Sequence, residues 1–242
     1  MSSFVIGDIH GCLSELSYLI EDLPLASGDR LVFLGDYIDR GPDSKGVISY
    51  LLDLQRENSY DLVFLKGNHE DMLLSYLGFG GNHGDVFLAN GGKPTLESYG
   101  VPSAVDDFRE LTMRMPKEHL QFYRELKSFY VMGSYFCVHA GIHPAILLEA
   151  QSETEMLWIR NQFIYRSHRL PYTVLFGHTP QNEVFFDLPY KIGLDTGLVY
   201  GNLLSCLDTD AKILYQIKRG KKSVKQSSIA KKWESRPPLW TP

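Results

Sequence analysis

The sequence predicts an α/β layered domain, and three observations carry this prediction. Short apolar stretches rich in Val, Ile, Phe and Leu are typical of buried strands. In the first part of the chain, segments with apolar residues at helical spacing follow these stretches in alternation. Several stretches also run directly into a Gly next to Asp, His or Asn. Strands that alternate with helices favour a sheet covered by helices, and polar residues beyond the strand ends favour a ligand site there.

The apolar stretches place the expected strands along the whole chain. Residues spaced three or four apart predict helices within 13–20, 47–54 and 72–77. In the last third of the chain, short expected strands follow one another without helices between them, and residues 208–210 are expected to form a hairpin turn. The expected strands are 4–6, 31–34, 62–65, 135–138, 174–176, 184–186, 191–194, 203–207 and 213–217.

Two segments lack a regular pattern. Residues 78–100 contain a cluster of glycines around Asn82, His83 and Asn90, which predicts a surface loop that could cover a site. Residues 218–242 are rich in Lys and Ser and then in Pro. We therefore expect one catalytic domain over residues 1–217 and a basic C-terminal tail over residues 218–242.

Composition limits the class of protein. The chain has 242 residues, of which 44% are hydrophobic and 22% charged, as in a globular domain with a sizeable core. No apolar run of about 18 residues and no signal segment is visible, so we expect a cytoplasmic protein without a membrane partner. The net charge of -5 offers no broad attraction for nucleic acid, although the basic tail could contact RNA or another acidic partner.

Five of the expected strands end in the same kind of block. Asp, Asn and His supply the oxygen and imidazole ligands that suit Mn, Fe or Zn, and the cysteines are too scattered for a thiolate site. Glycines allow the backbone to turn sharply and to approach a ligand. The blocks are Gly7-Asp8-Ile9-His10-Gly11, Gly35-Asp36-Tyr37-Ile38-Asp39-Arg40-Gly41, Gly67-Asn68-His69-Glu70, His139-Ala140-Gly141 and Gly177-His178-Thr179.

In this order and spacing, the blocks resemble the signature of the PPP-type serine/threonine phosphatases within the calcineurin-like metallophosphoesterase superfamily. The resemblance spans residues 4–195. It implies the calcineurin-like metallophosphoesterase fold, a central β-sandwich of mixed sheets flanked by helices. The sequences Gly177-His178-Thr179-Pro180 and Gly193-Leu194-Asp195-Thr196-Gly197 are similar to those of the bacterial and phage branch.

The resemblance also implies a centre of two divalent metal ions, for which we expect Mn²⁺, with Fe or Zn as alternatives. Two cations about 3.5 to 4 Å apart need a bridging carboxylate, and together they make a hydroxide available for in-line attack on phosphorus. Asp36 would bridge the two ions. The remaining implied ligands are Asp8 and His10 for the first ion and Asn68, His139 and His178 for the second.

Four further residues have implied catalytic roles. His69 would protonate the leaving alkoxide as a general acid, with Asp39 holding its ring. Arg40 and Arg160 would bind the phosphoryl oxygens, which a guanidinium group matches well. His69 could instead cap the helix that follows it, and Arg160 could be a solvated helix residue.

The expected activity is metal-dependent hydrolysis of phosphate monoesters, on phosphoserine or phosphothreonine of proteins and also on phosphotyrosine. The alternative is symmetrical hydrolysis of diadenosine tetraphosphate or another dinucleoside polyphosphate. The partner would thus be a phosphorylated protein or a small phosphoester. A third hypothesis, from a different class, is a non-catalytic binding module in which the metals serve as a scaffold.

Two other phosphatase chemistries do not fit the sequence. A cysteine phosphatase needs Arg six residues after its Cys, but that offset from the three cysteines gives Tyr18, His143 and Lys212. An aspartyl-phosphate mechanism needs Asp-x-Asp-x-Thr, and the nearest match, Asp208-Thr209-Asp210-Ala211-Lys212, ends in Lys. The sequence therefore offers no covalent nucleophile.

Overall fold

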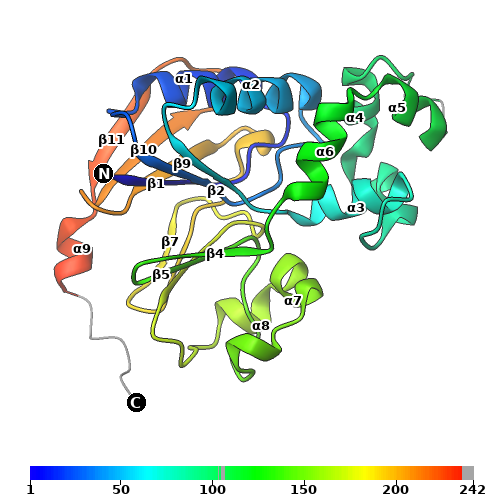
Figure 1. Ribbon diagram of the computed structural model, residues 1–242. Coiled ribbons are helices and arrows are strands. Elements are labelled where there is room, and N and C mark those ends of the chain that lie inside the picture. Colours follow the sequence, from blue (N-terminus) through cyan, green and yellow to red (C-terminus); the bar gives the residue numbers. More distant parts are fainter. Residues whose placement is uncertain (103, 105–106, 236–242) are drawn as a thin grey trace.

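Two β-sheets stack on each other, and helices cover their outer faces and one end (Figure 1). The computed structural model describes residues 1–102, 104 and 107–235. This arrangement confirms the predicted α/β class and the sandwich of mixed sheets.

The six-stranded sheet has the order β11-β10-β9-β1-β2-β3. Its strands β1, β2 and β3 are parallel, whereas β9, β10 and β11 are antiparallel to their neighbours. The parallel strands are joined through helices α1 and α2, which lie together on its outer face (Figure 1). The bounds are β1 Ser3–Ile6, β2 Arg30–Phe33, β3 Asp61–Phe64, β9 Leu203–Asp208, β10 Ile213–Lys218 and β11 Val224–Ser228.

The five-stranded sheet has the order β4-β5-β6-β8-β7, in which β5, β6 and β8 are parallel and the two edge strands are antiparallel. Helices α7 and α8 and the segments around them cover its outer face. The bounds are β4 Phe129–Met132, β5 Tyr135–Val138, β6 Thr173–Phe176, β7 Phe185–Asp187 and β8 Lys191–Gly193.

The core is divided between the faces of the two sheets. Along β1, Phe4 and Ile6 pack into the layer under the helices, whereas Val5 packs between the sheets with Leu175 and Ile192 of the second sheet. Successive side chains of a strand point to opposite faces, so a strand buried on both sides is apolar throughout. This explains why β1 has no polar alternation in its sequence.

The helices have the following bounds: α1 Leu13–Asp22, α2 Ser44–Glu57, α3 Asn68–Tyr76, α4 Lys93–Ser98, α5 Phe108–Arg114, α6 Lys117–Glu125, α7 Glu153–Trp158, α8 Asn161–Ile164 and α9 Ala230–Glu234. Short helical turns are η1 Gly84–Val86, η2 Leu88–Gly92, η3 Leu148–Ala150 and η4 Leu198–Tyr200. The helix α2 begins where the Asp43 side chain accepts a hydrogen bond from the Gly46 N–H, and it ends at Asn58 in a left-handed conformation.

The segment 78–100 departs from the predicted surface loop. It contains η1, η2 and α4, and Phe87 and Leu96 are fully buried in the core under the helices. The glycines misled the prediction because they occur between helical turns, as at Gly91 with φ of 107°. The apolar residues among them anchor the segment against the domain.

The expected tail also contains regular structure. The strand β11 pairs with β10 along its whole length, and α9 follows it. Val224 packs against the core, which explains how part of this basic segment extends the sheet. The rest of the predicted tail, residues 236–242, lies outside the described residues.

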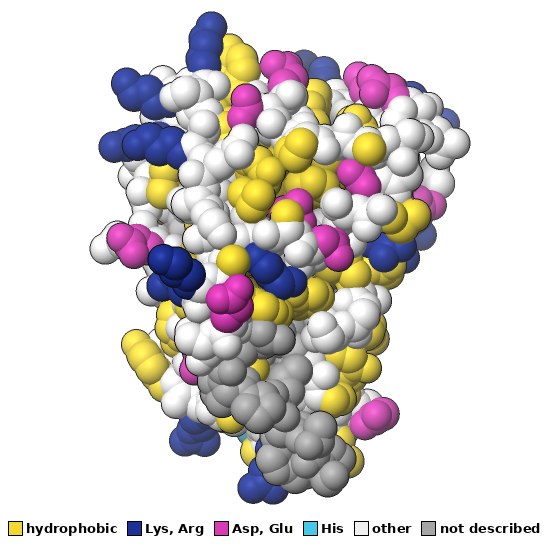
Figure 2. Space-filling model, turned by 90° about the vertical axis from the view of Figure 1, so that its left-hand side faces the viewer, with side chains coloured by type: hydrophobic (Ala, Val, Ile, Leu, Met, Phe, Trp, Pro, Cys, Tyr) yellow, Lys and Arg dark blue, Asp and Glu magenta, His cyan; other side chains and the backbone are white. Residues whose placement is uncertain are grey.

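The face around β11 and α9 has no continuous basic surface over the part that the structure describes. Figure 2 shows its Lys and Arg side chains separated by acidic, hydrophobic and neutral ones. Among the described residues, no helix has the length and apolar character needed to cross a bilayer.

Candidate active site

The six predicted metal ligands come together at one place, although they are up to 170 residues apart in the chain. Each lies just beyond the end of a parallel strand, and both sheets contribute because these strands end at the same edge of the sandwich. All six side chains are nearly inaccessible, with at most 4% of the residue surface exposed: Asp8, His10, Asp36, Asn68, His139 and His178.

Three of these residues have strained backbones. His10, Asp36 and His178 have φ values of 47°, 53° and 65°, in the left-handed region that non-glycine residues rarely adopt. Glu70 fixes one of these turns, since its carboxylate accepts hydrogen bonds from the N–H groups of Asp36 and Tyr37 at 3.0 and 2.8 Å. Strain of this kind persists only where the surroundings hold it, and it concentrates at functional sites.

Asp36 lies between two imidazoles. Its Oδ2 is 3.5 Å from His10 Nε2, and its Oδ1 is 3.4 Å from His139 Nε2. Both histidines donate from Nδ1 to a backbone carbonyl, of Ile38 at 2.8 Å and of Leu34 at 2.9 Å, so the neutral rings present the lone pair of Nε2 toward the carboxylate. Two electron-pair donors that face each other fit a cation between them.

The second half of the site has the same character. Asn68 Oδ1 lies 3.0 Å from His139 Nε2 and 2.8 Å from His178 Nδ1. His178 Nε2 is buried without a hydrogen-bond partner. The donor set of imidazole nitrogens, an amide oxygen and carboxylate oxygens is one that Mn, Fe or Zn accepts, and the residues present therefore fit two divalent cations.

Burial sets the ionisation of the site. It lowers the pKa of His10 to about 3 and also lowers the pKa of His139 and of His178, which keeps these rings neutral. Burial alone would raise the pKa of Asp36, but interactions with the surrounding histidines, among them His69, whose own pKa is raised, hold it well below its usual value. Neutral imidazoles and an ionised carboxylate are the forms that bind metal.

Asp8 lies close to two other buried carboxyl groups, those of Asp195 and Asp36. Burial, Asp195 and Asp36 raise the pKa of Asp8 well above its ordinary value, because these carboxylates repel one another in a dry environment. From the sequence, Asp195 is only part of a block similar to the bacterial and phage branch, yet the structure buries it beside the site. Its position after β8, a further parallel strand, is the signal that could have identified it.

His69 and Asp39 form a separate pair beside the ligands. His69 Nδ1 is 2.6 Å from Asp39 Oδ2, and the His69 ring meets the His10 ring edge-on, with centroids 4.7 Å apart. Burial alone would lower the pKa of His69, but Asp36 and the contact with Asp39 raise it. The other Asp39 oxygen accepts a hydrogen bond from Thr95 at 2.5 Å.

Thr95 is a residue that sequence reasoning missed. It lies in α4, inside the segment predicted to be a loop, and no motif marks it. Its hydroxyl holds Asp39 in place together with Ser44, whose Oγ accepts a hydrogen bond from the Asp39 N–H at 3.0 Å. The segment 78–100 therefore supports the His69–Asp39 pair.

The two arginines differ in how they are held. Arg40 Nη1 lies 2.6 Å from His10 Nε2, and the backbone N–H of Arg40 donates to the Gly91 carbonyl at 2.9 Å. Arg160 is exposed and directly precedes α8. Burial has the largest effect in lowering the pKa of His139 and of His178, and the positive charge of Arg160 lowers both pKa values further. The structure thus brings Arg40 to the ligands and Arg160 to the rim.

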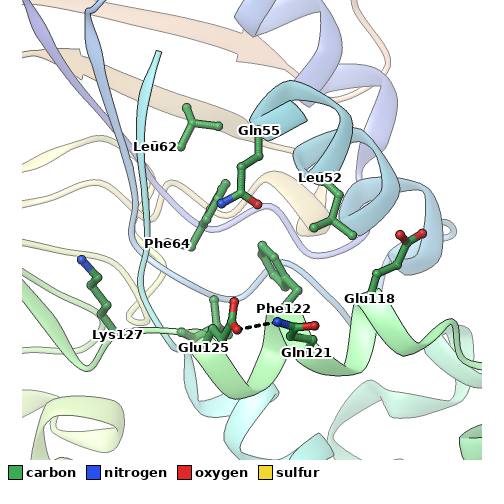
Figure 3. A pocket seen from close by; sticks show the side chains of 10 residues that line it. Leu52, Gln55, Leu62, Phe64, Glu118, Gln121, Phe122, Glu125 and Lys127 are labelled. Carbon is green, nitrogen blue, oxygen red and sulfur yellow. Dashed lines mark hydrogen bonds between the residues drawn. The ribbon is translucent and has the colours of Figure 1, made fainter. Parts of the chain in front are cut away.

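A cavity of about 260 Å³ lies elsewhere, between α2 and α6 beside the edge strand β3 (Figure 3). Leu62, Phe64 and Phe122 line the cavity. Polar side chains lie at its margin, including Gln121, whose amide donates a hydrogen bond to the Glu125 carboxylate at 2.7 Å. None of the predicted ligands or catalytic residues lines this cavity.

Close packing around the ligands predicts the effect of one small substitution. A Cβ added at Gly177 would overlap the Asp8 carboxylate. Gly177→Ala should therefore displace Asp8, lower metal affinity and destabilise the fold by about 1 to 3 kcal/mol, as overpacking does. Metal titration and thermal unfolding check this; unchanged metal affinity would show that Asp8 has room to move without loss.

The sequence is similar to those of known proteins. Residues 1–203 match the model of the calcineurin-like phosphoesterase family. The asymmetrical bis(5'-nucleosyl)-tetraphosphatase PrpE of Anoxybacillus flavithermus is 26% identical over 232 residues, covering 84% of this chain and 88% of its own. Serine/threonine-protein phosphatase 1 of Salmonella typhimurium is 30% identical over 214 residues, covering 84% of this chain and 89% of its own.

Solved structures show the same fold. A crystal structure of a putative diadenosine tetraphosphatase superposes with a TM-score of 0.70 at 24% identity, covering 90% of this chain and 93% of that one. A cold-active protein tyrosine phosphatase superposes with a TM-score of 0.61 at 18% identity, covering 93% of this chain and 78% of that one. The predicted fold is confirmed, and the chain belongs to the calcineurin-like phosphoesterase family of metal-dependent phosphoester hydrolases.

Proposed function

We propose that the protein hydrolyses phosphate esters at a centre of two divalent cations, with Mn²⁺ as the expected metal. The position of Asp36 carries this proposal, because its two oxygens face imidazoles of different ligand groups. One group contains Asp8 and His10, and the other contains Asn68, His139 and His178. When bound, the cations would supply a water of lowered pKa and neutralise charge on the phosphoryl group.

The neighbouring side chains then have distinct tasks. Asp39 accepts from His69 Nδ1, which orients the ring and leaves Nε2 to carry a proton to the leaving oxygen. Because Asp39 is itself fixed by Thr95 and Ser44, the ring is preorganised for this transfer. A complete acid pair of this kind argues against a non-catalytic metal scaffold.

Arg40 and Arg160 would bind the phosphoryl oxygens from two sides. Neither is expected to hold metal, since a guanidinium group has no lone pair to offer. Arg40→Ala and Arg160→Ala should therefore keep their metal content and lose about 10- to 1,000-fold in kcat, as when one charge-stabilising donor is removed. Elemental analysis together with kinetics measures both quantities.

Arg124→Ala is a suitable control, because Arg124 lies on α6 and contacts Phe79 rather than any ligand. It should retain activity. An unchanged kcat in Arg160→Ala would contradict a role in phosphate binding and would support the alternative that Arg160 is a solvated residue.

Two substrate classes remain in the proposal. Serine/threonine-protein phosphatase 1 of Salmonella typhimurium supports phosphoproteins, in agreement with the expectation from sequence. PrpE supports dinucleoside polyphosphates, although its name specifies asymmetrical hydrolysis, whereas the sequence led us to consider symmetrical hydrolysis. For diadenosine tetraphosphate, asymmetrical cleavage yields ATP and AMP, and symmetrical cleavage yields two ADP.

The decisive experiment compares kcat/KM for these substrates with the Mn²⁺-loaded protein. Phosphoserine, phosphothreonine and phosphotyrosine peptides and diadenosine tetraphosphate are assayed together, and the nucleotide products are separated. A strong preference for one class assigns the substrate. Absence of turnover on all of them and on p-nitrophenyl phosphate would contradict the proposed function and favour a binding module, and salt-dependent RNA binding would then indicate nucleic acid as its partner.

A further inference from the structure

Tyr200 is an exposed aromatic residue beside the candidate site. It ends the helical turn η4, and 63% of its surface is accessible, whereas most aromatic side chains in the part of the chain that the structure describes are buried or half-buried. The Arg40 guanidinium lies over its ring, with Cζ 5.7 Å from the ring centroid. Exposure alone is common for a surface aromatic residue, but a ring that also lies beside a proposed phosphate-binding group is placed to offer its face to a ligand.

The loop that carries Tyr200 is firmly held. Asp195, buried beside Asp8, accepts a hydrogen bond from the Gly197 N–H at 2.9 Å. The Asn202 side chain donates to the carbonyl groups of Asn182 and Thr196 at 2.9 and 2.7 Å. Leu198 is only 2% exposed. The loop is thus tied to the floor of the site at one end and presents the ring outward at the other.

Arg40 connects this ring to the reaction centre. Its Nη1 contacts His10 Nε2, which also lies 3.5 Å from the Asp36 carboxylate. A phosphate chain bound by Arg40 would therefore pass close to Tyr200. A planar group attached a few bonds beyond the phosphate could stack on the exposed ring, and such stacking tolerates every nucleobase.

We propose that Tyr200 is a stacking platform for the nucleobase of a nucleoside polyphosphate substrate. This inference deepens the proposed function and rests on it, since it assigns the substrate class of the same site. The phosphates would be recognised by Arg40 and the cations, and the base by the tyrosine ring. Phosphoserine and phosphothreonine carry no aromatic group and would gain nothing from this contact.

The test separates the base from the phosphates. We would titrate Mn²⁺-loaded protein with adenosine 5'-(β,γ-imido)triphosphate and with inorganic tripolyphosphate, which lacks the nucleoside. Tyr200→Ala should weaken binding of the nucleotide about 5- to 100-fold, the worth of one stacked base, with less than a twofold effect on tripolyphosphate. Tyr200→Phe keeps the ring and should restore nucleotide binding to within about threefold of the wild type.

Three outcomes would overturn the proposal. An equal loss for both ligands would mean that the ring only positions Arg40, and no loss for either would mean that it binds nothing. Unchanged titrations together with reduced turnover of a phosphotyrosine peptide, assayed in parallel, would assign the ring to an aryl ester instead. The titrations need no turnover, so they remain decisive even if the protein hydrolyses none of the phosphoesters and the proposed function fails.

Discussion

Asp36→Asn should abolish hydrolysis and bring the bound metal below two equivalents per chain. The substitution replaces one carboxylate oxygen with an amide nitrogen and removes the negative charge that lies between His10 and His139. Two cations at close distance then lack the anion that offsets their repulsion. Elemental analysis of the purified variant and turnover of p-nitrophenyl phosphate measure the two effects.

Asp53→Asn is the matched control, because Asp53 is an exposed residue of α2 that pairs with Arg56 and with no site residue. It should keep both metal content and activity. The fold of Asp36→Asn should survive, since the core of both sheets does not involve this carboxylate. Full metal occupancy with near-normal turnover in Asp36→Asn would contradict the assigned bridge.

His69→Asn should lower kcat by about 100- to 10,000-fold, the usual contribution of a positioned general acid. The two cations should remain bound, because His69 is paired with Asp39 and is not assigned as a ligand. His178→Asn should behave in the opposite way and weaken metal binding, since it removes a ring nitrogen beside Asn68. Metal content therefore separates the acid from the ligand.

The leaving group provides a second readout for His69. The p-nitrophenolate ion departs without much protonation, whereas a serine alkoxide needs a proton, so the defect should be larger on a phosphoserine peptide. His143→Asn serves as control, because that ring contacts Gln162 and no site residue. Loss of metal from His69→Asn would make His69 a ligand, which its proximity to His10 and Asp36 permits geometrically. Equal defects on both substrates, with chemistry rate-limiting, would also remove the acid role.

Much of the fold and of the site was predictable from sequence because the buried strands form recognisable apolar runs. Buried strands such as β1 are continuously apolar, and each carries its functional residues immediately beyond its end. Since parallel strands end at one edge, the blocks had to converge. The strand β11 was missed because it lies at the edge of its sheet, where Lys225 and Gln226 are exposed and no apolar run forms.

The supporting contacts were not predictable in this way. Thr95 reaches Asp39 from a segment whose glycines suggested a loop, and the bond depends on how α4 packs against α2. Tyr200 is visible in sequence only as one aromatic residue among many. Its meaning depends on exposure and on the nearby guanidinium, which are properties of the assembled tertiary structure.

The placement of ligands on both sheets has a mechanical consequence. Asp8 and Asp36 follow strands of one sheet, and His139 and His178 follow strands of the other. Cations held among them would tie the two sheets together at the edge where these strands end. Because the ligands of both sheets meet only in the folded protein, a higher cation concentration would raise its free energy of unfolding. The supply of metal would therefore set the stability of the protein as well as its rate of hydrolysis.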